Sequence, residues 1–163
     1  MSLKEKIEEQ PASDTLAALM AECKPKASEI VVTVQGKQLL LFRAWGSITA
    51  WEALKIEAQE WANRLKKNKV RDQVTTGNPG YDAACWILAK TMVGAFPSFE
   101  ENEPGKYQGV GEMEAPWTYA QWLNVARSIA GSVFEGISRQ VDAQQTDSAK
   151  AEFIGAVAKE GED

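Results

Sequence analysis

The stretch from residue 30 to residue 65 constrains the fold more than any other part of this chain. Two β-rich runs, residues 30–34 and 39–42, lie on either side of a turn at Gln35-Gly36. Runs of β-branched and large apolar residues joined by a short, Gly-containing turn are typical of a β-hairpin. A pattern for an amphipathic helix follows directly, so we expect the hairpin and this helix to pack as one unit.

A two-residue loop at Gln35-Gly36 predicts apolar side chains on both faces of the hairpin, because alternate residues of a strand point to opposite sides of the sheet. We find no convincing third strand in the sequence, and a lone hairpin is marginally stable in water. The hairpin is therefore expected to be covered by helices, or to be completed by a second copy of the chain. One predicted face carries Ile30, Val32, Val34, Leu39 and Leu41, and the other carries Val31, Leu40 and Phe42.

Five segments have helical patterns. The sequence Thr49-Ala50-Trp51-Glu52 has the form of a capping box, and apolar residues then recur every three or four positions as far as Leu65. Residues 81–93 are apolar nearly all round, which predicts a buried central helix that ends at Gly94. A second capping box, from Thr118 to Gln121, starts a long helix. Shorter helices are expected near residues 14–20 and 149–159.

The order of these segments predicts the fold class and the domain organisation. We expect an α+β fold, a mostly helical single domain with one N-terminal β-hairpin packed on amphipathic helices. Residues 1–13 are predicted to form a flexible N-terminus, residues 14–140 the domain with its hairpin at 29–43, and residues 141–163 a C-terminal helix and a mobile acidic tail. Residues 95–117, with three prolines, predict a long irregular segment.

The chain contains no histidine. Ser-His-Asp and Cys-His catalysis and the common histidine-containing metal sites are thereby excluded. Cys23 and Cys85 are too few for a disulfide framework, and we expect them to pack rather than to react. The acidic residues between 100 and 114 are expected to form a solvated loop. By elimination the sequence predicts a non-enzymatic interaction protein with no cofactor and no metal.

The charge and the hydropathy of the chain limit the partners and the compartment that we expect for it. A net charge of −5 argues against a nucleic-acid partner, which would favour clustered positive charge. No apolar run approaches the roughly 20 residues that a membrane-spanning helix needs. The first residues also lack the apolar core of a signal peptide. We therefore expect cytoplasmic residence and no membrane partner.

Apolar and aromatic residues without an obvious place in the core are the candidates for partner binding. They come from the second predicted face and the end of the hairpin, from the segment 95–117, and from the C-terminal helix. These candidates are Val31, Leu40, Phe42, Trp45, Phe99, Tyr107, Trp117, Phe153 and Ile154.

Over residues 14–140 the chain resembles the tail assembly chaperones of tailed phages of the siphovirus type. A short N-terminal helix precedes the hairpin sequence at residues 29–43, and a helix rich in Trp and Glu follows it. The helix at residues 83–92 then leads into Gly94-Ala95-Phe96-Pro97-Ser98-Phe99-Glu100-Glu101, and a helix that ends near Ile137-Ser138 closes the pattern. The resemblance is one of pattern and element order.

This resemblance implies a small protein of the host cytoplasm that shields apolar helices of the tape-measure protein during tail assembly. It also implies self-association and the absence of a cofactor, and it supplies no site residues. Two alternatives from other classes remain open. One is a small peptide- or carbohydrate-binding module that uses Trp45, Tyr107 and Trp117, and the other is a histidine-free enzyme with Asp/Glu or Cys chemistry.

Overall fold

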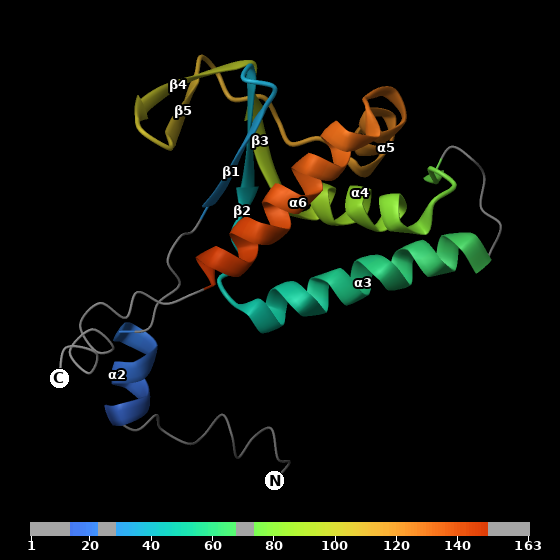
Figure 1. Cartoon of the computed structure of the whole chain (residues 1–163). Coiled ribbons are helices and arrows are strands. Elements are labelled where there is room, and N and C mark those ends of the chain that lie inside the picture. The colour runs from blue at the N-terminus through green and yellow to red at the C-terminus, as the bar shows by residue number, and fades with distance from the viewer. Residues whose placement is uncertain (1–13, 23–28, 68–73, 150–163) are drawn as a thin grey trace, which may run out of the picture.

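The computed structural model describes residues 14–22, 29–67 and 74–149, and it shows an α+β fold (Figure 1). The helices in these residues are α2 (Asp14–Glu22), α3 (Ile48–Lys67), α4 (Pro79–Thr91), α5 (Tyr119–Ser128) and α6 (Gly131–Ser148). The strands are β1 (Glu29–Val34), β2 (Gln38–Arg43), β3 (Met92–Phe96), β4 (Ser98–Glu103) and β5 (Lys106–Val110). The predicted fold class is confirmed, including the N-terminal hairpin packed on helices.

The register of the β1–β2 hairpin differs by one residue from the prediction. Three residues, 35–37, connect the strands, and Val32 pairs with Leu40 rather than with Leu39. Both Gln35 and Gly36 have positive φ, so the chain reverses there, and Lys37 adds one residue before the ladder begins. The shift places Leu40 and Phe42 on the same face as Ile30 and Val32, and not on the opposite face as predicted. The core face carries Ile30, Val32, Leu40 and Phe42, each at most 1% exposed.

The expectation of no third strand was wrong. β3 pairs antiparallel with β2, which gives a three-stranded sheet in the order β1-β2-β3. Helix α4 ends at Thr91, and the chain continues as a strand through Gly94, where the helix was predicted to end. The predicted irregular segment 95–117 also contains a second hairpin, because β4 and β5 pair antiparallel with each other.

The core lies between the three-stranded sheet and the helices α3 to α6. Figure 1 shows α3, α4 and α6 gathered on one side of this sheet, while the β4–β5 hairpin extends away from the helices. Trp51 and Leu54 of α3, Leu88 of α4, and Trp122 of α5 belong to the same hydrophobic cluster as the core face of the sheet. Cys85 is fully buried among them, as predicted for a packing residue.

One of the two predicted capping boxes forms. Thr118 and Gln121 form the predicted capping box of α5. The side chain of Asn78 accepts hydrogen bonds from the N–H groups of Gly80 and Tyr81 at the start of α4. In α3 the predicted box at Thr49 is wrong, because this helix begins at Ile48 and the N–H of Ala50 donates to the Ser47 hydroxyl instead.

The C-terminal part of the described chain forms two helices where one was predicted. α5 ends before Ile129, and α6 begins at Gly131. α6 then continues through Ser148, so the predicted boundary at residue 140 falls inside it. The helix predicted near residues 149–159 lies outside the described residues.

Candidate functional site: a groove between three helices

A groove of about 310 Å³ lies between α3, α4 and α6. Its apolar lining combines the small side chains of Ala58, Ala83 and Ala84 with the larger ones of Trp51, Ile87, Leu88 and Val141. Larger polar side chains stand along its rim. The lining residues are Trp51, Lys55, Ala58, Gln59, Gly80, Ala83, Ala84, Ile87, Leu88, Ser138, Arg139, Val141 and Asp142.

The groove continues toward the N-terminus of α4. A neighbouring hollow of about 510 Å³ shares Gly80, Ala84, Ser138 and Arg139 with the first, and it is bounded at its far end by Tyr81 and Phe134. α4 and α6 thus form the two long walls. Gly80 and Leu88 mark the length of the α4 wall, about 12 Å at the helical rise of about 1.5 Å per residue.

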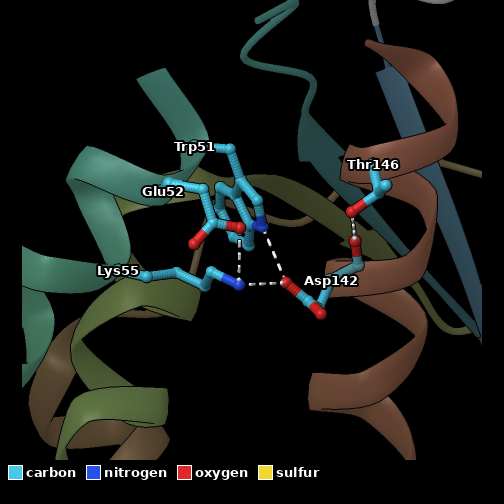
Figure 2. A network of polar contacts seen from close by, with 5 residues as sticks. All are labelled: Trp51, Glu52, Lys55, Asp142 and Thr146. Carbon is cyan, nitrogen blue, oxygen red and sulfur yellow. Dashed lines mark hydrogen bonds and ion pairs between the residues drawn. The ribbon is translucent and has the colours of Figure 1, made fainter. Parts of the chain in front are cut away.

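A polar network closes one end of the groove (Figure 2). Trp51 and Lys55 from α3 converge on Asp142 from α6, whose Oδ1 accepts from Trp51 Nε1 at 2.7 Å and from Lys55 Nζ at 3.1 Å. Glu52 accepts from the same Lys55 ammonium at 3.0 Å. One turn further along α6, the Thr146 hydroxyl donates to the Asp142 carbonyl at 3.1 Å. This network fixes the separation of α3 and α6.

Lys55 remains charged at neutral pH. Partial burial lowers the pKa of its ammonium, but the hydrogen bonds and the negative charges of Glu52 and Asp142 outweigh this effect and raise the pKa above its ordinary value. The Lys55 side chain is 37% exposed, so water still screens these ion pairs. The rim of the groove therefore carries a fixed cluster of one ammonium and two carboxylates next to an apolar floor.

The other end of the groove is closed by Tyr81. Its hydroxyl donates to Glu135 Oε1 of α6 at 2.7 Å, and its ring packs edge-on against Phe134 at 5.7 Å between centroids. The hydrogen bond to Glu135 and the charge of that carboxylate raise the pKa of Tyr81. Two polar bridges, one at each end, thus hold α6 over α4 and α3 while the middle of the groove stays open.

Two adjacent glutamines attach α6 to the sheet and so position the groove wall. Gln144 accepts from the N–H of Val31 and donates to its carbonyl, at 3.3 and 2.8 Å. Gln145, which is 1% exposed, accepts from the N–H of Trp45 at 3.0 Å and donates to the Arg43 carbonyl at 2.8 Å. The two side-chain amides thereby supply hydrogen-bond partners for backbone groups at the edge of β1 and at the end of β2.

The start of α4 is anchored by a buried carboxylate. Asp82 is 2% exposed, and it accepts from the Thr76 N–H at 2.6 Å, from the Thr76 hydroxyl at 2.8 Å, and from the Thr75 hydroxyl. A buried carboxylate is tolerated when hydrogen bonds replace its lost hydration. Asp82 therefore anchors the turn before α4.

Neither a reactive thiol nor a cluster of metal ligands is found among the described residues. Burial, and next the charge of Asp82, raise the pKa of the Cys85 thiol to about 12, so it is not a nucleophile near neutral pH. Within residues 14–22, 29–67 and 74–149, no group of three or more acidic or thiol side chains is placed to hold a metal ion. Glu100, Glu101 and Glu103 are exposed along β4. The groove is consequently the best-defined candidate site.

Two of the predicted partner-binding residues are in the core. Leu40 is 1% exposed and Phe42 is fully buried, because the one-residue difference in register places both on the face that packs against the helices. Both are therefore core residues, and their prediction as binding residues was wrong. Val31 lies on the opposite face and is partly buried, with its backbone groups bound to Gln144.

The other predicted residues lie at separate places. Trp45 is partly buried beneath the Arg43 guanidinium, at 5.0 Å from the ring centroid. Trp117 packs on Trp122 at 4.9 Å between centroids and belongs to the rim of the core. Phe99 and Tyr107 pack edge-on against each other at 5.3 Å on the β4–β5 hairpin. Phe153 and Ile154 lie outside the described residues.

The groove itself was missed by sequence reasoning. Residues 81–93 were interpreted as a helix buried on all sides, whereas Ala83 and Ala84 are only partly buried. The signal that could have revealed the groove is the spacing of Gly80, Ala83, Ala84 and Ile87, which places small side chains on one stripe of α4. Only the position of α6 shows that this stripe lines a groove.

The comparisons with known proteins assign no role to this site. No family model matches the chain, and no curated protein and no solved structure is detectably similar to it. In the part of the chain that the structure describes, no helix is both long and apolar enough to cross a membrane.

Proposed function

We propose that this chain is a non-enzymatic binding protein that holds an apolar helix of a partner in the groove between α3, α4 and α6. The observation that carries the proposal is the groove's composition, an apolar lining that includes three alanines beside polar side chains from α3 and α6. Grooves of this kind accept amphipathic helices, whose apolar residues recur every three or four positions. Ala83 and Ala84 leave room for the larger side chains that such a helix would insert.

The rim favours a partner helix of defined chemistry. Lys55 and Arg139 stand on opposite walls, and the described chain provides Arg139 with no ion pair. An apolar stripe with a carboxylate placed toward Arg139 would match the floor and this cation, whereas the charge of Lys55 is already balanced by Glu52 and Asp142. The α4 wall of about 12 Å corresponds to about two turns of a bound helix, so a long partner would engage several copies of this chain.

These features fit the role that the sequence resemblance implies. A tail assembly chaperone of a tailed phage covers the apolar helices of the tape-measure protein before the tail tube assembles, and it works in the host cytoplasm. We accordingly propose a tape-measure-like protein as the partner. Such a function requires no cofactor and no catalytic residue, only a surface that binds apolar helices.

Binding to the groove can be tested with a synthetic amphipathic helical peptide that carries leucine and alanine on one face and glutamate beside it. Trp51 lines the groove, so peptide binding should change tryptophan fluorescence. In the variant Ala84→Phe the new ring would fill the groove and binding should be lost. Ala120→Phe, at an exposed position of α5, is the matched control and should bind as the wild type does.

The chaperone role itself can be tested by co-expression with the tape-measure protein encoded in the same genome. The wild-type chain and Ala120→Phe should keep that protein soluble, whereas Ala84→Phe should let it aggregate. Equal solubility with and without the chain would contradict the chaperone role, and unchanged peptide binding by Ala84→Phe would contradict the groove.

A further inference from the structure

The helix α2 is short and exposed, and it lies apart from the other helices (Figure 1). It has nine residues, and isolated helices shorter than about 12–15 residues are marginal in water. Its side chains from Asp14 to Leu19 are all exposed, including Leu16 at 46% and Leu19 at 57%. A helix of this kind gains stability when its apolar side packs against another surface.

The groove between α3, α4 and α6 matches α2 in length and in chemistry. A helix of nine residues extends for about 13 Å, and the α4 wall from Gly80 to Leu88 extends for about 12 Å. Leu16 and Leu19 are three positions apart, so they lie on one face of α2. The small side chain of Ala84 leaves room for them between the walls.

The chain between α2 and β1 is long enough to place α2 in the groove. Six residues separate Glu22 from Glu29, and six extended residues span at most about 20 Å. Glu29 pairs with Arg43, whose carbonyl accepts from Gln145 of α6. Gln145 is only about 4.5 Å of helix beyond Asp142, which lines the end of the groove. The connection to α2 therefore starts beside that end of the groove.

The same connection sets the direction in which α2 would lie. Its C-terminus would enter at Asp142, and its N-terminus would point toward the end that Tyr81 bounds. Arg139 lies one turn of α6 before Asp142 and lines both hollows together with Gly80. It is exposed and has no ion-pair partner among the described residues. Asp14, the first residue of α2, would bring a carboxylate to this cation.

We propose that α2 folds back into the groove and covers it, so that a partner helix must displace α2 in order to bind. This regulation rests on the proposed function, because α2 and the partner use the same groove. The short connection gives α2 a high effective concentration at the groove, so weak contacts suffice to hold it there. The apparent affinity for a partner falls in proportion to the fraction of molecules whose groove is open.

The cover can be tested without a partner, by hydrogen exchange of the α2 amides in the full chain. These amides should exchange about tenfold faster in Ala84→Phe than in the wild type, because the new ring occupies the place of α2. Ala120→Phe, at an exposed position of α5, is the control and should exchange as the wild type does. Equal exchange in the wild type and in Ala84→Phe would overturn the proposal.

A charge exchange tests the same contact without filling the groove. Asp14→Lys and Arg139→Glu should each speed up exchange in α2, because each places like charges together. The double variant should restore the protection, since opposite charges then meet again. A double variant that exchanges as fast as the single variants would overturn the proposed position of α2.

Peptide affinity separates the cover from the proposed function. Leu16→Ser/Leu19→Ser weakens the apolar face of α2 and leaves the groove unchanged, so it should bind the leucine–alanine–glutamate peptide about tenfold more tightly than the wild type. Ile56→Ser, at an exposed position of α3 outside the groove, is the control. Unchanged affinity would overturn the cover and leave the groove as a binding site. Protection of α2 that depends on the groove, with no peptide binding by any variant, would support the cover and contradict the proposed function.

Discussion

Two antiparallel hairpins of similar length within the described residues have opposite surroundings. In β1–β2, the residues Ile30, Val32, Leu40 and Phe42 are at most 1% exposed, and they form one wall of the core. In β4–β5, every residue except Phe99 and Gly109 is exposed. The first hairpin is built into the fold, whereas the second extends from it (Figure 1).

The difference shows that a hairpin needs partners for its edges as well as for its faces. β2 gains a strand partner in β3, and β1 gains a side-chain partner in Gln144. β4–β5 gains neither, and its aromatic pair supplies only a small apolar contact. The expectation that chains meet at β1–β2 was based on an incomplete sheet, and β3 removes that basis. The incomplete sheet is β4–β5.

The largest expected effect compares one phenylalanine from each hairpin. Phe42→Ala should lower the free energy of unfolding by about 3–5 kcal/mol, since it deletes a fully buried ring and leaves a cavity. Phe99→Ala should lower it by about 1 kcal/mol or less, because it removes a partly exposed ring pair. Denaturation by guanidinium, followed by circular dichroism, measures both. Equal losses would show that the second hairpin is as much a part of the core as the first.

An intermediate effect is expected where a side chain completes the backbone next to the first hairpin. Gln145→Leu keeps the size of the side chain but leaves the Trp45 N–H and the Arg43 carbonyl without a partner. We expect a loss of about 1–3 kcal/mol in the free energy of unfolding, the usual penalty for an unsatisfied buried group. Amide exchange at Trp45 should also become faster. The exposed Gln140 provides the control, and Gln140→Leu should change stability by less than ~0.5 kcal/mol. A similar loss in both variants would mean that the glutamine amide does not stabilise this end of the sheet.

The sequence patterns predicted the parts of this fold that depend on local periodicity. The stripe of α3 and the box of α5 follow from spacings within one helix, and the hairpin at residues 29–43 follows from two β-rich runs around a glycine. The strand β3 was missed because Met92-Val93-Gly94-Ala95-Phe96 continues the apolar run of α4. Periodicity alone cannot distinguish a short buried strand from the end of a buried helix.

The register and the candidate site depend on features that spacing does not encode. One additional loop residue, Lys37, moves Leu40 and Phe42 from the outer face to the core face. The groove exists because Asp142 and Glu135 of α6 bind residues of α3 and α4 that lie more than fifty positions away in the chain. The sequence contains the alanines of α4, but only the packing of α6 makes them the floor of a groove.

The smallest expected effect compares the ion pairs of the two regions. Lys55 in the helical body bonds to both Glu52 and Asp142, whereas Lys106 of β5 pairs with Glu103 of β4, and these two side chains are 77% and 65% exposed. Replacement by methionine keeps most of the apolar stem and removes the charge. We expect Lys55→Met to lower the free energy of unfolding by about 0.5–1 kcal/mol, because one ammonium joins two helices, and Lys106→Met to change it by less than ~0.3 kcal/mol.

The measurement is denaturation by urea, which is not a salt, at low and at high salt concentration. Added salt screens exposed ion pairs and should narrow the difference in unfolding free energy between the two variants. A larger loss for Lys106→Met would reverse the comparison and show that charge, rather than the aromatic pair, holds the second hairpin in place.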